Sequence, residues 1–188
     1  MRRLVIEPPM TEAEALRLAT EEEIAAARDF RPERRREFLA WRALVRREVG
    51  GECRFGYREN GAPYLVGRDD LFIGVAHCRG RIAVAISEAP CAVDIEPLSR
   101  DFGPAISRFM TDREQRLSED PSWPAAAWCA KETLYKYAGL PGLDLRRDLR
   151  LEGFDPSAGT ISGRIRASAP LRLSFGCRDG FVAVWMLE

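Results

Sequence analysis

The chain has 188 residues, which is enough for one large domain or two small, closely packed ones. Its 29 Lys and Arg residues balance its 29 Asp and Glu residues, so nothing in the net charge marks a polyanion such as a nucleic acid as the main partner. The composition, 46% hydrophobic and 31% charged, is typical of globular proteins.

Turn residues and apolar spacing divide the first half of the chain into short helices and strands. Thr20 and Glu23 form a capping-box pattern, and Pro32 and Gly50 bracket a longer helix with an apolar stripe. We expect, in chain order, a strand over 2–7, helices over 11–18, 20–30 and 32–49, and strands over 53–57, 64–66, 72–76, 81–87 and 91–96.

The second half repeats this order of helices followed by strands. A loop over 99–104 precedes a predicted helix over 105–117, and a further helix has Pro124 in its first turn and ends at Gly139. Strands are expected over 149–151, 160–166, 171–175 and 181–187. This order predicts an α+β fold with two similar halves.

The predicted strand over 91–96 carries two carboxylates with alternate spacing. Val93 and Ile95 can enter the core, while Asp94 and Glu96 share the other face, roughly 7 Å apart. Two carboxylates at this distance repel each other unless a positive charge lies between them, and oxygen ligands suit a hard cation such as Mg²⁺. The alternative is a solvated strand face that ends in a turn.

The chain has only two lysines among 27 arginines, and both lie on the helix that ends at Gly139. Lys131 and Lys136 stand on either side of Glu132, which indicates sites where a compact ammonium is needed. Glu132 and Lys136 also fit an ordinary surface pair, but Trp128 flanks them and argues against a fully solvated face. Three carboxylates and two lysines are what transfer of a phosphate-linked group requires.

These motifs together resemble those of the 4′-phosphopantetheinyl transferases, in particular the longer, surfactin-synthetase-activating (Sfp-type) class. The family's strand motif G-[IV]-D-[IV]-E resembles residues 92–96, and its helix motif W-x-x-K-E-[SA]-x-x-K resembles residues 128–136. Four further segments are similar in the same chain order: the first-half helix at 38–46, the G-K-P turn at 61–63, the F-N-[IV]-S-H strand at 73–77 and R-F-[FS]-x-x-E at 108–114.

The resemblance implies transfer of the phosphopantetheine arm of coenzyme A to a serine of an acyl or peptidyl carrier protein, with release of adenosine 3′,5′-bisphosphate. It also implies two α/β halves, here residues 1–91 and 92–188, packed as a pseudo-twofold dimer with the active site in the cleft between them. We therefore expect a monomer.

The resemblance also implies roles for the motif residues. Asp94, Glu96 and Glu132 would hold Mg²⁺, or Mn²⁺, on the coenzyme A pyrophosphate. Glu132, or Glu96 through a water molecule, would deprotonate the carrier serine. Lys136 would neutralise charge on the pyrophosphate, and Lys131 would orient this end of the helix or contact a phosphate of coenzyme A.

The chain departs from the family pattern at several phosphate contacts. Gly74 and Ala76 replace an asparagine and a serine, and Ala62 replaces a lysine. Glu22 and Ala25 lie roughly where the family has basic residues. We expect an arginine to substitute, and prefer Arg42 to Arg28 and Arg36. His77, the only histidine, is a further candidate for a coenzyme A phosphate; the alternative is a structural hydrogen bond at a strand end.

Two other groups of residues have competing interpretations. Phe109, Met110 and Trp123 could form an apolar docking surface for the carrier protein, or belong to the core. The arginines over 31–47 could bind RNA, but interleaved glutamates and the zero net charge favour a solvated helix face.

Other features exclude several classes of protein. Five widely spaced cysteines without a CxxC pair predict reduced thiols rather than disulfides or a zinc site. The absence of a long apolar run and of a signal-peptide pattern predicts a soluble, cytoplasmic protein without a membrane partner. The competing functional hypothesis is a non-catalytic coenzyme A or carrier-protein binding module with the same fold.

Overall fold

The computed structural model describes residues 1–51 and 53–187 and mixes helices with strands. None of the helices in this part of the chain is long and apolar enough to cross a membrane. The helices and strands, in chain order, are β1 (Arg2–Glu7), α1 (Glu12–Leu16), α2 (Glu21–Ala26), α3 (Pro32–Val49), β2 (Phe55–Tyr57), β3 (Pro63–Leu65), β4 (Phe72–Cys78), β5 (Arg81–Ser87), β6 (Cys91–Pro97), η1 (Gly103–Ala105), α4 (Ile106–Phe109), α5 (Asp112–Gln115), α6 (Trp123–Ala138), β7 (Leu149–Asp155), β8 (Thr160–Ile165), β9 (Leu171–Arg178) and β10 (Phe181–Leu187).

In the first half, helix α3 packs on an antiparallel sheet with strand order β1-β5-β4, and α1, α2 and the two-stranded sheet β2-β3 complete it. Trp41, Leu44 and Val45 of α3 form one buried cluster with Val84 and Ile86 of β5, as the predicted apolar stripe requires. The capping box of Thr20 and Glu23 is also present and begins α2. The predicted helix over 32–49 is thus confirmed, with Pro32 in its first turn and Gly50 at its end.

The second half places helix α6 against a five-stranded antiparallel sheet with order β6-β10-β9-β8-β7. Ala126, Ala130 and Leu134 of the helix pack with Val182 and Val184 of β10. Because β10 lies between β6 and β9, the strand with the two carboxylates is an edge strand of this sheet. The helix that lies against this sheet carries both lysines of the chain.

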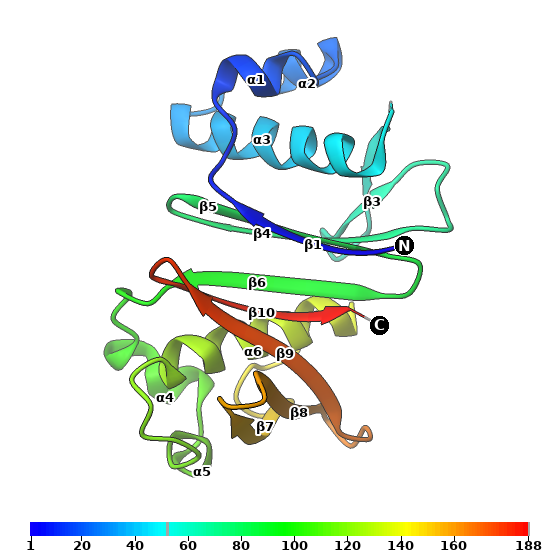
Figure 1. Cartoon of the computed structure of the whole chain (residues 1–188). Helices are drawn as coiled ribbons and strands as arrows, with labels where there is room; N and C mark the ends of the chain where they lie inside the picture. Colours follow the sequence, from blue (N-terminus) through cyan, green and yellow to red (C-terminus); the bar gives the residue numbers. More distant parts are fainter. Residues whose placement is uncertain (52, 188) are drawn as a thin grey trace.

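The two sheets lie face to face, with α3 outside one and α6 outside the other (Figure 1). The buried residues of the layer between the sheets are mostly small: Ala76, Ala83, Ala85, Val93, Ile95 and Ala183. Larger, partly buried side chains such as Phe181 and Trp185 pack against them. At Gly74 a Cβ atom would lie 3.0 Å from the Cα of Ala92, so strand β4 approaches β6 as closely as a glycine allows. Each half therefore has a helix on the outer side of its sheet; a pseudo-twofold relation between the halves stays a prediction.

The predicted single helix over 105–117 is wrong. It is divided into η1, α4 and α5, and Met110 between α4 and α5 has extended backbone dihedrals. Thr111 begins α5 with a capping box, in which its hydroxyl accepts from the Glu114 amide and the Glu114 carboxylate accepts from the Thr111 amide. These side-chain hydrogen bonds to the backbone replace helical hydrogen bonds at Thr111, so one helix ends and another begins there.

Candidate active site between the two halves

Strand β6 presents its two carboxylates to helix α6. Val93 and Ile95 are buried between the sheets, so Asp94 and Glu96 project from the opposite face of the strand. Asp94 is buried and Glu96 is half-buried, and neither lies on a solvated strand face of the kind that the alternative interpretation required.

Lys136 of α6 pairs with Asp94 instead of forming a surface pair with Glu132. Its ammonium lies 2.7 Å from Asp94 Oδ1 and donates to the carbonyl of Val93 at 3.0 Å. The second oxygen of Asp94, Oδ2, is buried without a hydrogen-bond partner among the residues that the structure describes. An unpaired buried carboxylate oxygen is unfavourable, and a ligand that coordinates it would remove that penalty.

The other two carboxylates lie in the same electrostatic environment. Burial raises the pKa of Glu132, and the neighbouring negative charge of Asp94 raises it further. Burial also raises the pKa of Glu96, while Arg100 opposes the rise and Asp94 adds to it. Three carboxylates thus face two cations, Lys136 and Arg100, and this leaves an excess of negative charge.

Arg100 is a site residue that the sequence analysis missed. Its guanidinium forms an ion pair with Glu96, four residues earlier, and its carbon atom lies 4.7 Å from the ring centre of Phe102 and 5.0 Å from that of Trp128. The only signal in the sequence was that Arg100 follows Glu96 by four residues. This spacing predicts a contact in a helix but not in a loop.

The donor set around Asp94 fits a hard divalent cation such as Mg²⁺ or Mn²⁺. The ligand atoms that the protein would supply are carboxylate oxygens, one of them unpaired and buried, in a region of net negative charge. In the described residues, however, no three His, Cys, Asp or Glu side chains are already gathered around one point. Lys136 and Arg100 neutralise two of the carboxylates instead.

A cavity of about 460 Å³ lies beside this cluster and is lined by both halves. The turn at 61–63, Phe72 and Gly74 come from the first half, while Glu132 and Lys136 come from α6. The side-chain amide of Asn60 donates to the carbonyl of Gly139 at 2.9 Å and so joins the two halves at the rim. The sequence thus brings the G-x-P turn and the lysine helix to one cavity.

Lys131, by contrast, has a structural role. Its side chain is 0% exposed, and its ammonium contacts Glu114 at 2.8 Å and the carbonyls of Leu145 and Leu149 at 2.9 and 2.8 Å. These three partners use all three of its hydrogen atoms. Of the two expected roles of Lys131, these contacts favour orientation of this end of the helix over a contact with coenzyme A.

Arg42 is buried as well. It is 3% exposed and donates to the carbonyl of Phe38 at 2.8 Å and to the hydroxyl of Tyr57. Its guanidinium carbon lies 3.4 Å from the ring centre of Phe38, and Glu23 lies 3.6 Å from its Nε. Burial lowers the pKa of Arg42. These contacts join α3 to β2 and α2, so the preference for Arg42 as a phosphate ligand is not supported.

Arg36 and His77 are brought together in a second cavity of about 340 Å³, with Arg79 and Arg81. His77 Nδ1 lies 3.4 Å from Glu37 Oε1. Cys78 also lines this cavity; burial raises the pKa of its thiol to about 11, and Glu96 and Asp94 contribute.

The predicted apolar docking surface is wrong. Phe109 and Met110 are 0% exposed and Trp123 is 2% exposed, and all three belong to the core between α6 and its sheet. Trp123 also donates its indole N–H to the carbonyl of Glu114 at 2.9 Å. The alternative interpretation of these residues as core is confirmed.

Comparisons with known proteins give one result for this part of the molecule. No curated protein matches the chain. The segment from 90 to 182 contains Asp94, Glu96, Glu132 and Lys136, and a family model covers all of it. This segment matches the 4′-phosphopantetheinyl transferase superfamily, which supports phosphopantetheinyl transfer, with coenzyme A as substrate, as the general chemistry of the site.

Proposed function

We propose that this protein transfers 4′-phosphopantetheine from coenzyme A to a serine of an apo acyl or peptidyl carrier protein, as an Sfp-type transferase. The observation that carries the proposal is the contact of Lys136 with Asp94, beside Glu132 and at a cavity lined by both halves. It combines the three carboxylates, an ammonium and space for a ligand. The family match covers all of these charged residues.

Coenzyme A would lie in the cavity of about 460 Å³, with its pyrophosphate at Lys136. The turn at 61–63 would contact its nucleotide end. Arg36 and His77 line the separate cavity of about 340 Å³, so they would contact a phosphate of coenzyme A only if the ligand extended into that cavity; Arg42 and Lys131 are buried in internal contacts.

The reaction would form a P–O bond between the serine Oγ and the phosphorus that carries the pantetheine arm. The P–O bond to adenosine 3′,5′-bisphosphate breaks, and the bisphosphate leaves with the electron pair. Glu132, or Glu96 through a water molecule, would take the serine proton. Burial raises the pKa of both carboxyls above the ordinary value. Lys136 balances the charge that develops on the leaving group.

A divalent cation bound to Asp94, Glu96 and Glu132 would polarise the pyrophosphate and stabilise its negative charge. This chain supplies the oxygen ligands and holds Asp94 through the pairing of β6 with β10 and the ion pair with Lys136 of α6. The pKa values of the two glutamates are raised because buried carboxylates lie close to one another without a bound cation between them.

A second candidate is a binding module that does not catalyse transfer. The observation in its favour is that Lys136 and Arg100 already neutralise Asp94 and Glu96 in the described structure. The replacement of the family's lysine by Ala62 points the same way. Such a module would bind coenzyme A or the carrier protein and release both unchanged.

Intact-mass measurement of a panel of apo carrier proteins, incubated with this protein, coenzyme A and Mg²⁺, separates the two candidates. Transfer adds one phosphopantetheine to the carrier and stops when EDTA is added. Asp94→Asn should abolish the mass gain, whereas Asp69→Asn, at an exposed loop position, should not. Binding of coenzyme A without any mass gain would favour the module instead.

A further inference from the structure

The only asparagine of the chain lies at the rim of the cavity of about 460 Å³. Asn60 precedes the turn at 61–63 in the first half, and Gly139, at the end of α6, lines the same cavity from the second half. A residue type that the chain uses once, like its two lysines, marks a position where the more common residues would not serve.

The side-chain amide of Asn60 makes one hydrogen bond with its oxygen and one with its nitrogen. Oδ1 accepts from the amide of Ala62 at 3.1 Å, which shapes the turn within the first half. Nδ2 donates to the carbonyl of Gly139 at 2.9 Å, which joins that turn to α6. The reversed amide would place donor against donor and acceptor against acceptor, so the two contacts together fix its orientation.

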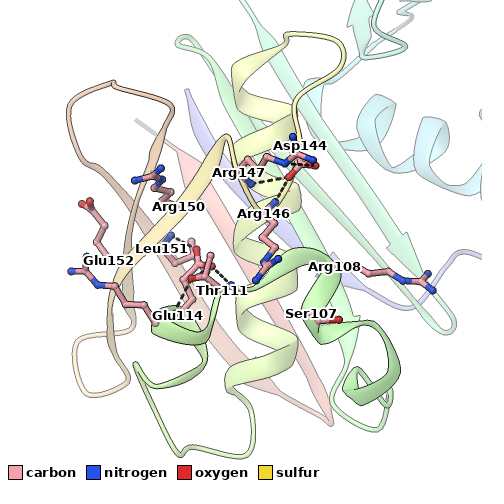
Figure 2. Close-up of a pocket in the computed structure, with 11 residues that line it drawn as sticks. Ser107, Arg108, Thr111, Glu114, Asp144, Arg146, Arg147, Arg150, Leu151 and Glu152 are labelled. Carbon is pink, nitrogen blue, oxygen red and sulfur yellow. Dashed lines mark hydrogen bonds and ion pairs between the residues drawn. The ribbon is translucent and has the colours of Figure 1, made fainter.

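Aspartate makes the first of these two bonds elsewhere in the chain. Asp144 accepts from the amide of Arg146, two residues later, at 2.9 Å (Figure 2). The same contact with the second amide along the chain, at 2.9, 2.8 and 3.0 Å, is made by Asp101, Asp120 and Asp155. A carboxylate therefore suffices for this kind of turn, but it has no hydrogen to donate to a carbonyl. The amide at position 60 is explained by its second bond.

The bond to Gly139 acts on the end of the helix that carries Lys136. The last carbonyls of a helix have no amide partner within the helix, so a donor from outside satisfies one of them. Gly139 ends α6 with a φ of 63°, three residues after Lys136. Asn60 thus holds this helix end to a turn that lines the cavity from the other half.

We propose that Asn60 is a positioning residue for coenzyme A, which fixes the turn at 61–63 relative to Lys136 before the ligand binds. This inference rests on the proposed function for the identity of the ligand. Because the ligand would contact segments of both halves, a bond between these segments removes part of the ordering that binding would otherwise require. Neither partner of Asn60 belongs to the carboxylate cluster, so its effect falls on binding and not on the chemical step.

Preorganisation of this kind stabilises the bound ground state and the transition state equally. Its loss therefore raises KM for coenzyme A and leaves kcat unchanged. One hydrogen bond between uncharged groups corresponds to a change of about fivefold in affinity. Adenosine 3′,5′-bisphosphate, which would occupy only the nucleotide end beside the turn, should lose affinity by the same factor.

Three variants of the full chain separate the two bonds of Asn60. Asn60→Asp and Asn60→Ser keep an oxygen for the amide of Ala62 and lose the amide nitrogen that reaches Gly139, the first with a negative charge and the second without one. Asn60→Ala removes both bonds. Asp155→Ala is the matched control, because it removes the same kind of turn bond between β7 and β8.

Calorimetric titration with coenzyme A and with adenosine 3′,5′-bisphosphate measures binding without transfer, and initial rates give kcat and KM for coenzyme A and for the carrier protein. We expect all three Asn60 variants to weaken binding of both nucleotides, and to raise KM for coenzyme A, by at least about fivefold. Their kcat and their KM for the carrier should stay within about twofold of the wild type. Their Tm should fall by no more than about 4 °C, because the bond is exposed. Asp155→Ala should change none of the kinetic constants.

The pattern among the variants decides the inference. Wild-type affinity in Asn60→Asp and Asn60→Ser, with a loss only in Asn60→Ala, would mean that the turn alone matters and would overturn it. A loss only in Asn60→Asp would be an effect of charge and would overturn it as well, as would a fall in kcat with unchanged KM.

The same measurements distinguish this inference from the proposed function. Normal transfer by the wild type with no effect at Asn60 overturns the inference and leaves the function intact. Binding of coenzyme A that depends on Asn60, without any transfer by the wild type, overturns the function and supports the positioning role. Absence of coenzyme A binding by the wild type overturns both.

Discussion

Lys131→Met tests whether the buried ion pair of Lys131 and Glu114 holds the second half together. The substitution keeps the volume of the side chain but leaves Glu114 buried without its cation and the carbonyls of Leu145 and Leu149 without a donor. Breaking a buried pair from one side costs about 3–5 kcal/mol. With an unfolding entropy of about 2.1 cal/mol/K per residue, this corresponds to a fall in Tm of about 8–13 °C.

Urea and thermal unfolding followed by circular dichroism measure this loss. The matched control is Arg164→Met, which breaks an ion pair with Glu152 in the same half where both side chains are about one-third exposed. Exposed pairs contribute about 1 kcal/mol or less, so this control should change Tm little. A Lys131→Met protein as stable as the control would refute the structural role.

The double variant Lys131→Met/Glu114→Gln completes the argument. Glutamine has no charge to neutralise and can still accept from the amide of Leu151, but it loses the acceptor of the Thr111 amide, so it should recover only part of the loss. Where Lys131→Met remains folded, its KM for coenzyme A should equal that of the wild type. A selective rise in that KM would restore the ligand contact that the sequence analysis predicted.

Three further predictions concern the site and the layer between the sheets. Arg100→Ala frees the carboxylate of Glu96 and should raise the affinity for Mn²⁺ severalfold in a calorimetric titration; unchanged affinity would contradict the idea that Arg100 competes with the cation. Gly74→Ala forces backbone atoms apart and should destabilise the protein by about 1–3 kcal/mol in urea, whereas Gly176→Ala meets only ordinary contacts and should be nearly neutral. Asp94→Asn should lower the rate of transfer by about a hundredfold or more with little change in Tm; a smaller loss would argue against its place in the cluster.

Local sequence signals were sufficient for the long elements. Pro32 and Gly50 bracket α3, Gly139 ends α6 in a left-handed conformation, and alternation along β6 separates Asp94 from the core residues. These features depend on backbone preferences and on side-chain period, which the sequence contains directly. The expected α+β class followed from their order.

Long-range partners could not be predicted in the same way. Lys131 and Glu114 are 17 positions apart, and only the packing of α5 against β7 and α6 determines that they meet. The division between α4 and α5 was visible as a T-x-x-E pattern at Thr111, but the helical propensity of the flanking residues hid it. Phe109 likewise looked equally suited to core and surface until the break in the helix turned it inward.

The layer of small side chains between the sheets has a consequence for the reaction. Because the cavity is lined by both β4 and β6, its width depends on how closely these strands approach each other, and small buried side chains such as Ala76 allow a close approach. A methyl group added in the layer between the sheets would push the sheets apart and so widen the cavity, without contacting the ligand. The residues between the sheets do not contact the ligand, but they influence the distance between the turn at 61–63 and the charged groups of α6.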